Sequence, residues 1–93
     1  MRVSGKTVLI TGASSGIGAA TAKAAAQRGA AHVVLWARGE EELNAVAASI
    51  ETDDTKAHTW SVDLADAAAV DKASEHVLSN VGVFYVELFF MFL

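Results

Sequence analysis

The chain has 93 residues, of which 53% are hydrophobic, and a formal net charge of −4. This length allows one small domain, and the apolar, acidic composition excludes a disordered chain and a general nucleic-acid-binding surface. Because cysteine is absent, disulfides, thiolate metal sites and cysteine nucleophiles are excluded as well. The amino terminus enters an apolar run at Thr7 without the apolar segment of a signal peptide, so we expect a cytoplasmic protein.

The first half of the chain alternates between strand and helix signals. Residues 7–10 are apolar and partly β-branched, which predicts a strand, and the alanine-rich residues 17–27 predict a helix. Gly29 stands where that helix would end. Residues 32–37 are continuously apolar apart from the first, which is typical of a strand buried on both faces.

The second half continues the alternation. Residues 40–50 predict a helix with three glutamates in its first turn, where the helix dipole favours negative charge. Residues 56–62 predict a third strand, and a further helix follows Asp63. The apolar faces of these two helices are Leu43, Val46, Ala47 and Ile50, then Val70, Ala73, Ser74, Val77 and Val81. Right-handed crossovers at this spacing predict an α/β fold, the amino-terminal half of a Rossmann-type doubly wound parallel sheet, over residues 1–80.

The segment 81–93 departs from this pattern, because it holds all four phenylalanines, the only tyrosine and a single charge at Glu87. One interpretation is a buried fourth strand. Another is an end that did not evolve with the fold, as a frameshift, a misplaced splice boundary or a truncated gene model would produce. The segment is shorter than the roughly 20 apolar residues of a membrane span, so we expect no membrane association.

The turn between the first strand and the first helix carries the clearest chemical signal. Glycines at positions 12, 16 and 18 allow a sharp turn, a close approach to a pyrophosphate and tight seating of the helix. The unpaired amides at the start of the helix would then point at the phosphate, and Ser14 and Ser15 add hydroxyl donors. The turn therefore predicts a nucleotide site, with a dinucleotide as the expected ligand.

The run Thr11-Gly12-Ala13-Ser14-Ser15-Gly16-Ile17-Gly18 resembles the Thr-Gly-x-x-x-Gly-x-Gly signature of the short-chain dehydrogenase/reductase family, and the likeness extends to about Val81. It implies an NAD(P)-dependent oxidoreductase. The implied cofactor contacts are Gly12, Ser14, Ser15, Gly16, Ile17 and Gly18 in the turn, with Asp63 and Leu64 after the third strand, where the family commonly places an aspartate on the adenine. Asp63 or Asp66 would alternatively cap the following helix.

Arg38 bears on the choice of cofactor. An acidic residue at the end of the second strand would bind the adenosine ribose and repel a 2′-phosphate, but Ala37 stands there with Arg38 next to it. We therefore expect NADP rather than NAD. The alternative is an arginine that is simply solvated ahead of Gly39.

Catalytic and metal residues are not indicated. The resemblance implies a Tyr-x-x-x-Lys pair with a serine and an asparagine, but Tyr85 is followed four residues later by Phe89, and no lysine occurs after Lys72. No catalytic residue is carried over. The three histidines lie on different predicted elements without ligand spacing, so we expect no metal site.

Three functions follow from these observations. The chain is the NADP-binding portion of an oxidoreductase that transfers hydride, a nucleotide-binding module without chemistry, or a non-functional truncation product. The sequence indicates neither the substrate nor the oligomeric state.

Overall fold

The computed structural model describes residues 3–13, 16–80 and 88–89. Each predicted strand and the first two helices agree with it to within one residue at each end. The elements in chain order are β1 (Thr7–Thr11), α1 (Gly16–Gln27), β2 (His32–Ala37), α2 (Glu40–Ile50), β3 (Lys56–Ser61), α3 (Ala67–Asn80) and β4 (Leu88–Phe89).

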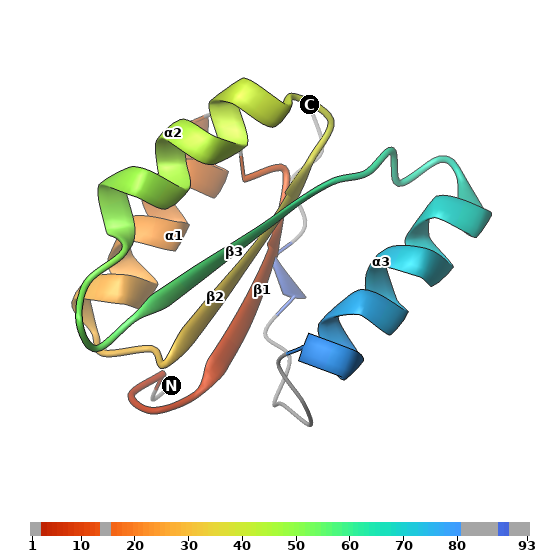
Figure 1. The fold of residues 1–93 in the computed structure, drawn as a ribbon. Helices are drawn as coiled ribbons and strands as arrows, with labels where there is room; N and C mark the ends of the chain where they lie inside the picture. Colours follow the sequence, from red (N-terminus) through yellow and green to blue (C-terminus); the bar gives the residue numbers. More distant parts are fainter. Residues whose placement is uncertain (1–2, 14–15, 81–87, 90–93) are drawn as a thin grey trace.

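The strands form one parallel sheet in the order β3-β2-β1-β4. Helices α1 and α2 cover one face of this sheet, and α3 lies on the other (Figure 1). The change of face follows from right-handed crossovers, because the chain moves outward from β1 to β3 and then returns to the far side of β1. This is the Rossmann-type α/β arrangement that the sequence predicts.

The core has two parts, one on each face of the sheet. Successive residues of a strand point to opposite faces, so neighbouring residues of β1 and β2 enter different clusters. The larger cluster contains Val8, Ile10, Val33 and Leu35 with Ala22, Ala25, Leu43 and Ile50 from α1 and α2. The smaller contains Leu9, Val34, Trp36 and Val62 with Ala73 and Val77 from α3. The predicted face of α2 and the Val70, Ala73 and Val77 part of the predicted face of α3 therefore point toward the sheet, while Val81 lies outside the described residues.

Helix α1 ends in a Schellman motif. Gly29 has φ of 84°, its N–H donates to the Ala26 carbonyl over 3.0 Å, and the Ala30 N–H donates to the Ala25 carbonyl over 3.2 Å. The carbonyl of Ala30 in turn accepts a 2.6 Å hydrogen bond from Thr55 Oγ1, and this threonine is completely buried. The loop before β3 is thereby fixed to the end of α1.

Strand β3 stands at one end of the strand order, and its outward groups meet side chains of the preceding helix and loop. The Ala57 N–H donates to Glu51 Oε2 over 3.1 Å, and Thr59 Oγ1 donates to Asn44 Oδ1 over 3.2 Å. The first contact covers part of the open side of β3, and the second joins β3 to α2.

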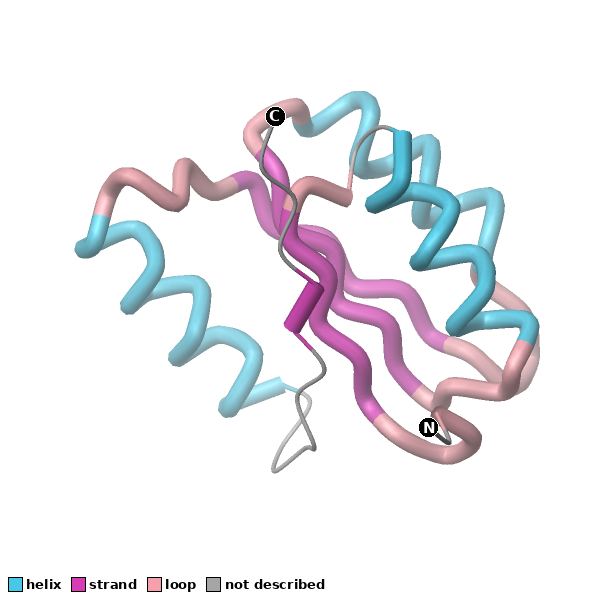
Figure 2. Tube along the Cα trace, turned by 180° about the vertical axis from the view of Figure 1, so that it is seen from behind, coloured by secondary structure: helices cyan, strands magenta, loops and turns pink. Residues whose placement is uncertain are grey.

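Strand β4 runs beside β1, where Leu88 and Phe89 pair in parallel with Leu9 and Ile10 (Figure 2). Residues 81–87 and 90–93 lie outside the described residues, so the division of the chain at residue 80 stays a prediction. Within the described ranges, no helix has both the length and the continuous apolar character that a bilayer crossing demands.

Candidate functional site

The glycine turn begins where β1 ends. Gly12 has φ of 67° and Gly16 has φ of 55°, a left-handed conformation that is costly for residues with a Cβ. The Ala13 N–H donates to the Trp36 carbonyl over 3.2 Å, which anchors the turn to the end of β2. Ser14 and Ser15, the predicted hydroxyl donors, lie outside the described residues.

Gly18 is the third residue of α1 and is buried. A Cβ at this position would overlap the carbonyl oxygen of Gly12 and stand 2.8 Å from its carbonyl carbon and 3.1 Å from the Ala13 Cα. Real Cβ atoms essentially never approach other atoms closer than 3.0 Å, as the Gly12 carbonyl would require here. The absence of a side chain at Gly18 is therefore what lets α1 rest directly on the turn, as the sequence predicts for the third glycine.

The amino terminus of α1 is suited to an anion. The first amides of a helix lack partners within the helix and carry the positive end of its dipole. The first turn of α1 contains no acidic residue, so that positive end is not neutralised from within the helix. Ile17 lies in this turn with 65% of its surface exposed, which leaves an apolar side chain available beside the amides.

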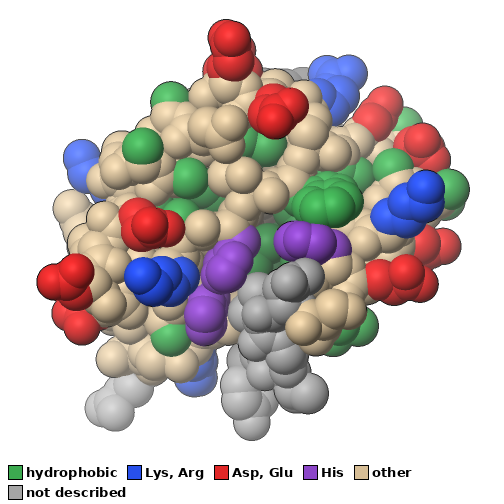
Figure 3. Space-filling model, viewed as in Figure 1, with side chains coloured by type: hydrophobic (Ala, Val, Ile, Leu, Met, Phe, Trp, Pro, Cys, Tyr) green, Lys and Arg blue, Asp and Glu red, His purple; other side chains and the backbone are tan. Residues whose placement is uncertain are grey.

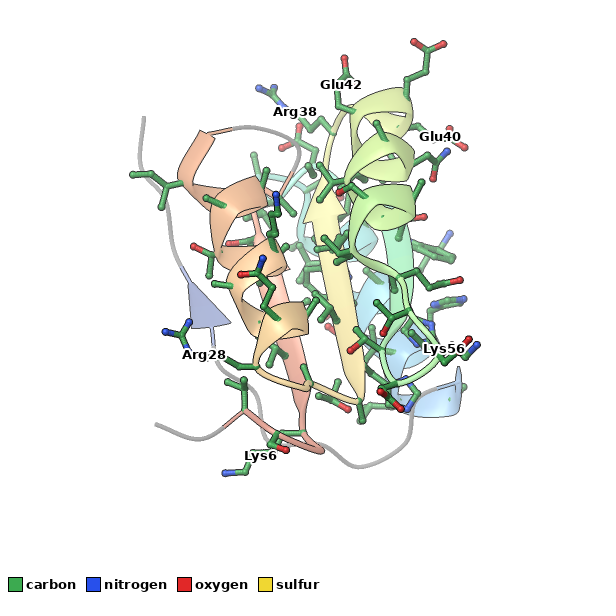
Figure 4. All side chains as sticks on the ribbon, turned by 90° about the vertical axis from the view of Figure 1, so that its left-hand side faces the viewer. Lys6, Arg28, Arg38, Glu40, Glu42 and Lys56 are labelled. Atoms are coloured by element: carbon green, nitrogen blue, oxygen red, sulfur yellow. The ribbon has the colours of Figure 1, made fainter. Side chains whose placement is uncertain are left out.

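Arg38 follows β2 and is exposed. Its carbonyl accepts a 2.8 Å hydrogen bond from Ser61 Oγ at the end of β3, so the backbone that carries the guanidinium is held in place. Figure 4 shows Arg38 near Glu40 and Glu42, whereas Lys6, Arg28 and Lys56 lie toward the other end of the strands. Ser61 could not be predicted from the sequence, because its contact depends on the pairing of β2 with β3.

Carboxylates surround the start of α2. Glu40, Glu41 and Glu42 occupy its first turn, and a Cβ at Gly39 would stand 3.0 Å from the Glu42 Cδ. The Glu42 carboxylate is thus folded back over Gly39. Gly39 is the N-cap residue of α2, and no side-chain hydrogen bond caps this helix. Arg38 therefore places a cationic side chain beside an acidic helix start.

The loop after β3 shows which of its two aspartates caps α3. Asp66 Oδ1 accepts the Ala69 N–H over 3.2 Å, which makes Asp66 the cap of α3. Asp63 Oδ1 instead accepts the Ala65 N–H over 2.9 Å within the turn. Asp63 is exposed, as is 44% of Leu64, so neither side chain is committed to the core.

Three loops that carry the predicted contacts leave the sheet at the same edge. The strand register pairs Thr11 with Trp36 and Ala37 with Ser61, so the glycine turn, Arg38 and Asp63 follow the carboxyl ends of adjacent strands. This edge is where doubly wound sheets bind their ligands. A surface hollow of about 540 Å³ lined by Ala47, Ala48, Glu51, Thr52, Asp53 and Lys56 lies at the opposite edge and is a separate feature.

The histidines gather on one side of the molecule (Figure 3). His32 Nδ1 and His58 Nε2 are 2.9 Å apart and share a hydrogen bond, while His76 stacks on Trp60 with 4.1 Å between ring centroids. Burial lowers the pKa of His58, and the neighbouring His32 lowers it further. Among the described residues, no group of three or more ligand side chains is placed to hold a metal ion.

The fold and the glycine turn together define a Rossmann-type α/β protein. The family model described as short chain dehydrogenase matches residues 6–86, and this chain belongs to the short-chain dehydrogenase/reductase family, a family of NAD(P)-binding oxidoreductases. The resemblance inferred from the glycine spacing is confirmed.

Individual relatives match over most of this chain. A fatty acyl-CoA reductase from Acinetobacter baylyi is 47% identical over 79 residues, covering 85% of this chain and 26% of the relative. The L-sorbose reductase of Gluconobacter frateurii, solved with NADPH and L-sorbose, has a TM-score of 0.80 at 39% identity over 90% of this chain and 33% of that one. An NAD⁺-bound xylitol dehydrogenase has a TM-score of 0.82 at 28% identity, covering 90% and 32%. The chain thus spans about a quarter to a third of the length of these proteins.

Proposed function

We propose that this chain is the NADP-binding portion of a short-chain dehydrogenase/reductase and holds the dinucleotide for hydride transfer. The proposal is carried by the strand register. It places the glycine turn, Arg38 and Asp63 just after the carboxyl ends of adjacent strands, at one edge of the sheet. A dinucleotide is long enough to need such separated contacts for its pyrophosphate, its ribose and its adenine.

Each contact has a physical basis. The turn of Gly12, Gly16 and Gly18, with Ser14 and Ser15, would receive the pyrophosphate, because backbone amides at a helix start attract phosphate. The exposed apolar surfaces of Ile17 and Leu64 would contact apolar parts of the cofactor, and the Asp63 carboxylate would accept a hydrogen bond from the adenine amino group. The bound cofactor supplies the hydride chemistry, while these residues bind and orient it.

The proposal assigns no catalytic group to this chain. The sequence contains no Tyr-x-x-x-Lys pair, which would supply the proton exchanged with substrate. The second candidate is a module that binds the nucleotide without chemistry. Both candidates require cofactor affinity, and they differ in whether the bound cofactor is used.

Arg38 supports NADP over NAD. The position at the end of β2 holds Ala37 rather than an acidic residue, and the Arg38 guanidinium is exposed beside it. One of the solved relatives holds NADPH and another NAD⁺, so the preference proposed for this chain rests on Arg38. A charge-assisted hydrogen bond to a phosphate contributes about 1.5–3 kcal/mol, which is roughly ten- to a hundredfold in affinity.

Calorimetric titration of the purified chain with NADPH and with NADH tests the proposal. We expect tighter binding of NADPH, and we expect Arg38→Glu to remove that preference while NADH affinity changes little. Arg28→Glu is the matched control, because Arg28 is also exposed but lies at the other end of the strands. No binding of either dinucleotide would overturn the proposed site, and unchanged NADPH affinity in Arg38→Glu would overturn the role of Arg38.

A further inference from the structure

Two hydrogen bonds from the end of β3 hold the peptides on either side of the Arg38 Cα. The carbonyl of Ala37, in the peptide before it, accepts the Val62 N–H over 2.9 Å. The carbonyl of Arg38, in the peptide after it, accepts the Ser61 hydroxyl over 2.8 Å. The φ and ψ angles of Arg38 are therefore both restrained by β3. The first restraint is made by backbone, whereas the second depends on the side chain of Ser61.

From this geometry we infer that Ser61 is a positioning residue for the adenosine 2′-phosphate of NADP and acts through Arg38. The inference rests on the proposed function, in which the Arg38 guanidinium binds that phosphate. Ser61 lies at the end of β3, opposite Ala37 in the register, and its hydroxyl donates to the Arg38 carbonyl. It thereby sets the direction in which the Arg38 side chain leaves the backbone, without touching the cofactor.

The direction of the side chain matters because of the shape of the guanidinium. This group is planar and binds a phosphate best through two parallel N–H donors. The arginine side chain is long, so a small rotation at its Cα moves the guanidinium far enough to break such a contact. Arg38 is exposed, so packing does not fix its side chain, and the backbone is the part of the residue that the fold restrains. A restrained backbone leaves less freedom to be lost when the phosphate binds.

The acidic start of α2 makes the restraint more important. Glu40 and Glu42 lie near Arg38 (Figure 4), and their carboxylates compete with a phosphate for the guanidinium. Ser61 opposes rotation of the peptide that follows Arg38, because it holds the carbonyl oxygen of that peptide. Since Ser61 is exposed, water can replace its hydroxyl as a donor, but water does not fix the direction of the carbonyl. Loss of the hydroxyl should therefore affect phosphate binding more than stability.

The test is calorimetric titration of the 93-residue chain with NADPH and with NADH. We expect Ser61→Ala to weaken NADPH binding about two- to tenfold, the range of one hydrogen bond, and to leave NADH binding unchanged. Ser61→Thr keeps the hydroxyl and should bind NADPH as the unmodified chain does. Ser49→Ala is the matched control, because it removes another exposed hydrogen bond from a serine to a carbonyl, that of Val46, and should not change NADPH affinity. Unchanged NADPH affinity in Ser61→Ala, or an equal loss for both dinucleotides, overturns the inference.

A double-mutant cycle shows whether Ser61 acts through Arg38. In the Arg38→Gln background, Ser61→Ala should cause no further loss of NADPH affinity, because the group that Ser61 positions is gone. A loss of the same size in both backgrounds contradicts the inference. If the NADPH preference depends on Arg38 and not on Ser61, the proposed function stands and this inference alone fails. If the unmodified chain binds neither dinucleotide, the proposed function fails, and this inference fails with it.

Discussion

The Cα of Gly18 lies against the carbonyl of Gly12, close enough that a methyl group at position 18 has no space. This contact fixes the distance between the first helix and the turn after the first strand. The position of the helix amides relative to the end of the sheet therefore depends on a single missing side chain.

Substitution of Gly18 by Ala should destabilise the fold, because the added methyl would meet backbone atoms of Gly12 and Ala13 that cannot rotate away. Overpacking of this kind costs about 1–3 kcal/mol of unfolding free energy, and the displaced helix should also bind NADPH more weakly. Urea unfolding followed by circular dichroism measures the first effect. Ala20→Ser, on an exposed position of the same helix, should change stability by no more than about 0.5 kcal/mol. Equal stability of the two variants would contradict the contact.

Replacing Asp66 by Ala and replacing Asp63 by Ala should have different effects on stability and on NADPH affinity. Because Asp66 accepts the Ala69 N–H, its loss removes the cap of α3 and should cost about 0.5–2 kcal/mol of unfolding free energy. Asp63 makes a local turn contact, so its loss should affect stability less and lower NADPH affinity more. Thermal unfolding combined with dinucleotide titration checks both. The reverse pattern would give the capping role to Asp63.

Replacement of Thr55 by Val should destabilise the chain although the side chain keeps its shape. The Thr55 hydroxyl is fully buried and donates to the Ala30 carbonyl, so its removal deprives a buried carbonyl of its donor, at a cost of about 1–3 kcal/mol. Thr59→Val is the matched control, because it removes a more exposed hydrogen bond, to Asn44. Chemical denaturation of both variants should show the larger loss for Thr55→Val, and a larger loss for Thr59→Val would refute it.

Acid should weaken the fold through His58. Burial and the neighbouring His32 hold its pKa below the ordinary 6.5 in the folded chain, so the unfolded chain binds the proton more readily. The stabilisation by neutral His58 is complete above pH 6.5 and is lost as the pH falls through the lowered pKa. Unfolding free energy measured against pH, without added metal, should decline over this window, and His58→Gln should flatten that decline. An unchanged profile in the variant would exclude His58 as the source.

The sequence predicted well the features that depend on neighbours along the chain. The glycine spacing indicated the turn and the family, and the positions of Leu43 and Ile50 indicated the buried face of α2. Features that depend on the register between strands could not be predicted. Ser61 contacts the Arg38 carbonyl and His32 meets His58 only because β2 and β3 pair as they do, and no local pattern encodes that alignment.

The aspartates illustrate an intermediate case. Both Asp63 and Asp66 precede α3 closely enough to cap it, so the sequence alone did not show which of them is the cap. The choice depends on the position of the turn before α3. The Asp66 N–H donates to the Asp63 carbonyl over 3.0 Å, so this turn spans Asp63 to Asp66 and the helix begins after it. Capping preferences act over one or two residues, and that is finer than the precision with which a helix start can be read from sequence.

The contact between Glu51 and Ala57 has a consequence for how copies of this chain meet. The Ala57 N–H points away from β2, on the side where a further strand would add, and Glu51 Oε2 already accepts it. A second chain that approached this edge would have to displace a carboxylate and leave its negative charge beside its own backbone carbonyls. Open strand edges promote assembly into larger aggregates unless charge blocks them. The carboxylate of Glu51 thus occupies one of the N–H donors that a strand added at this edge would need.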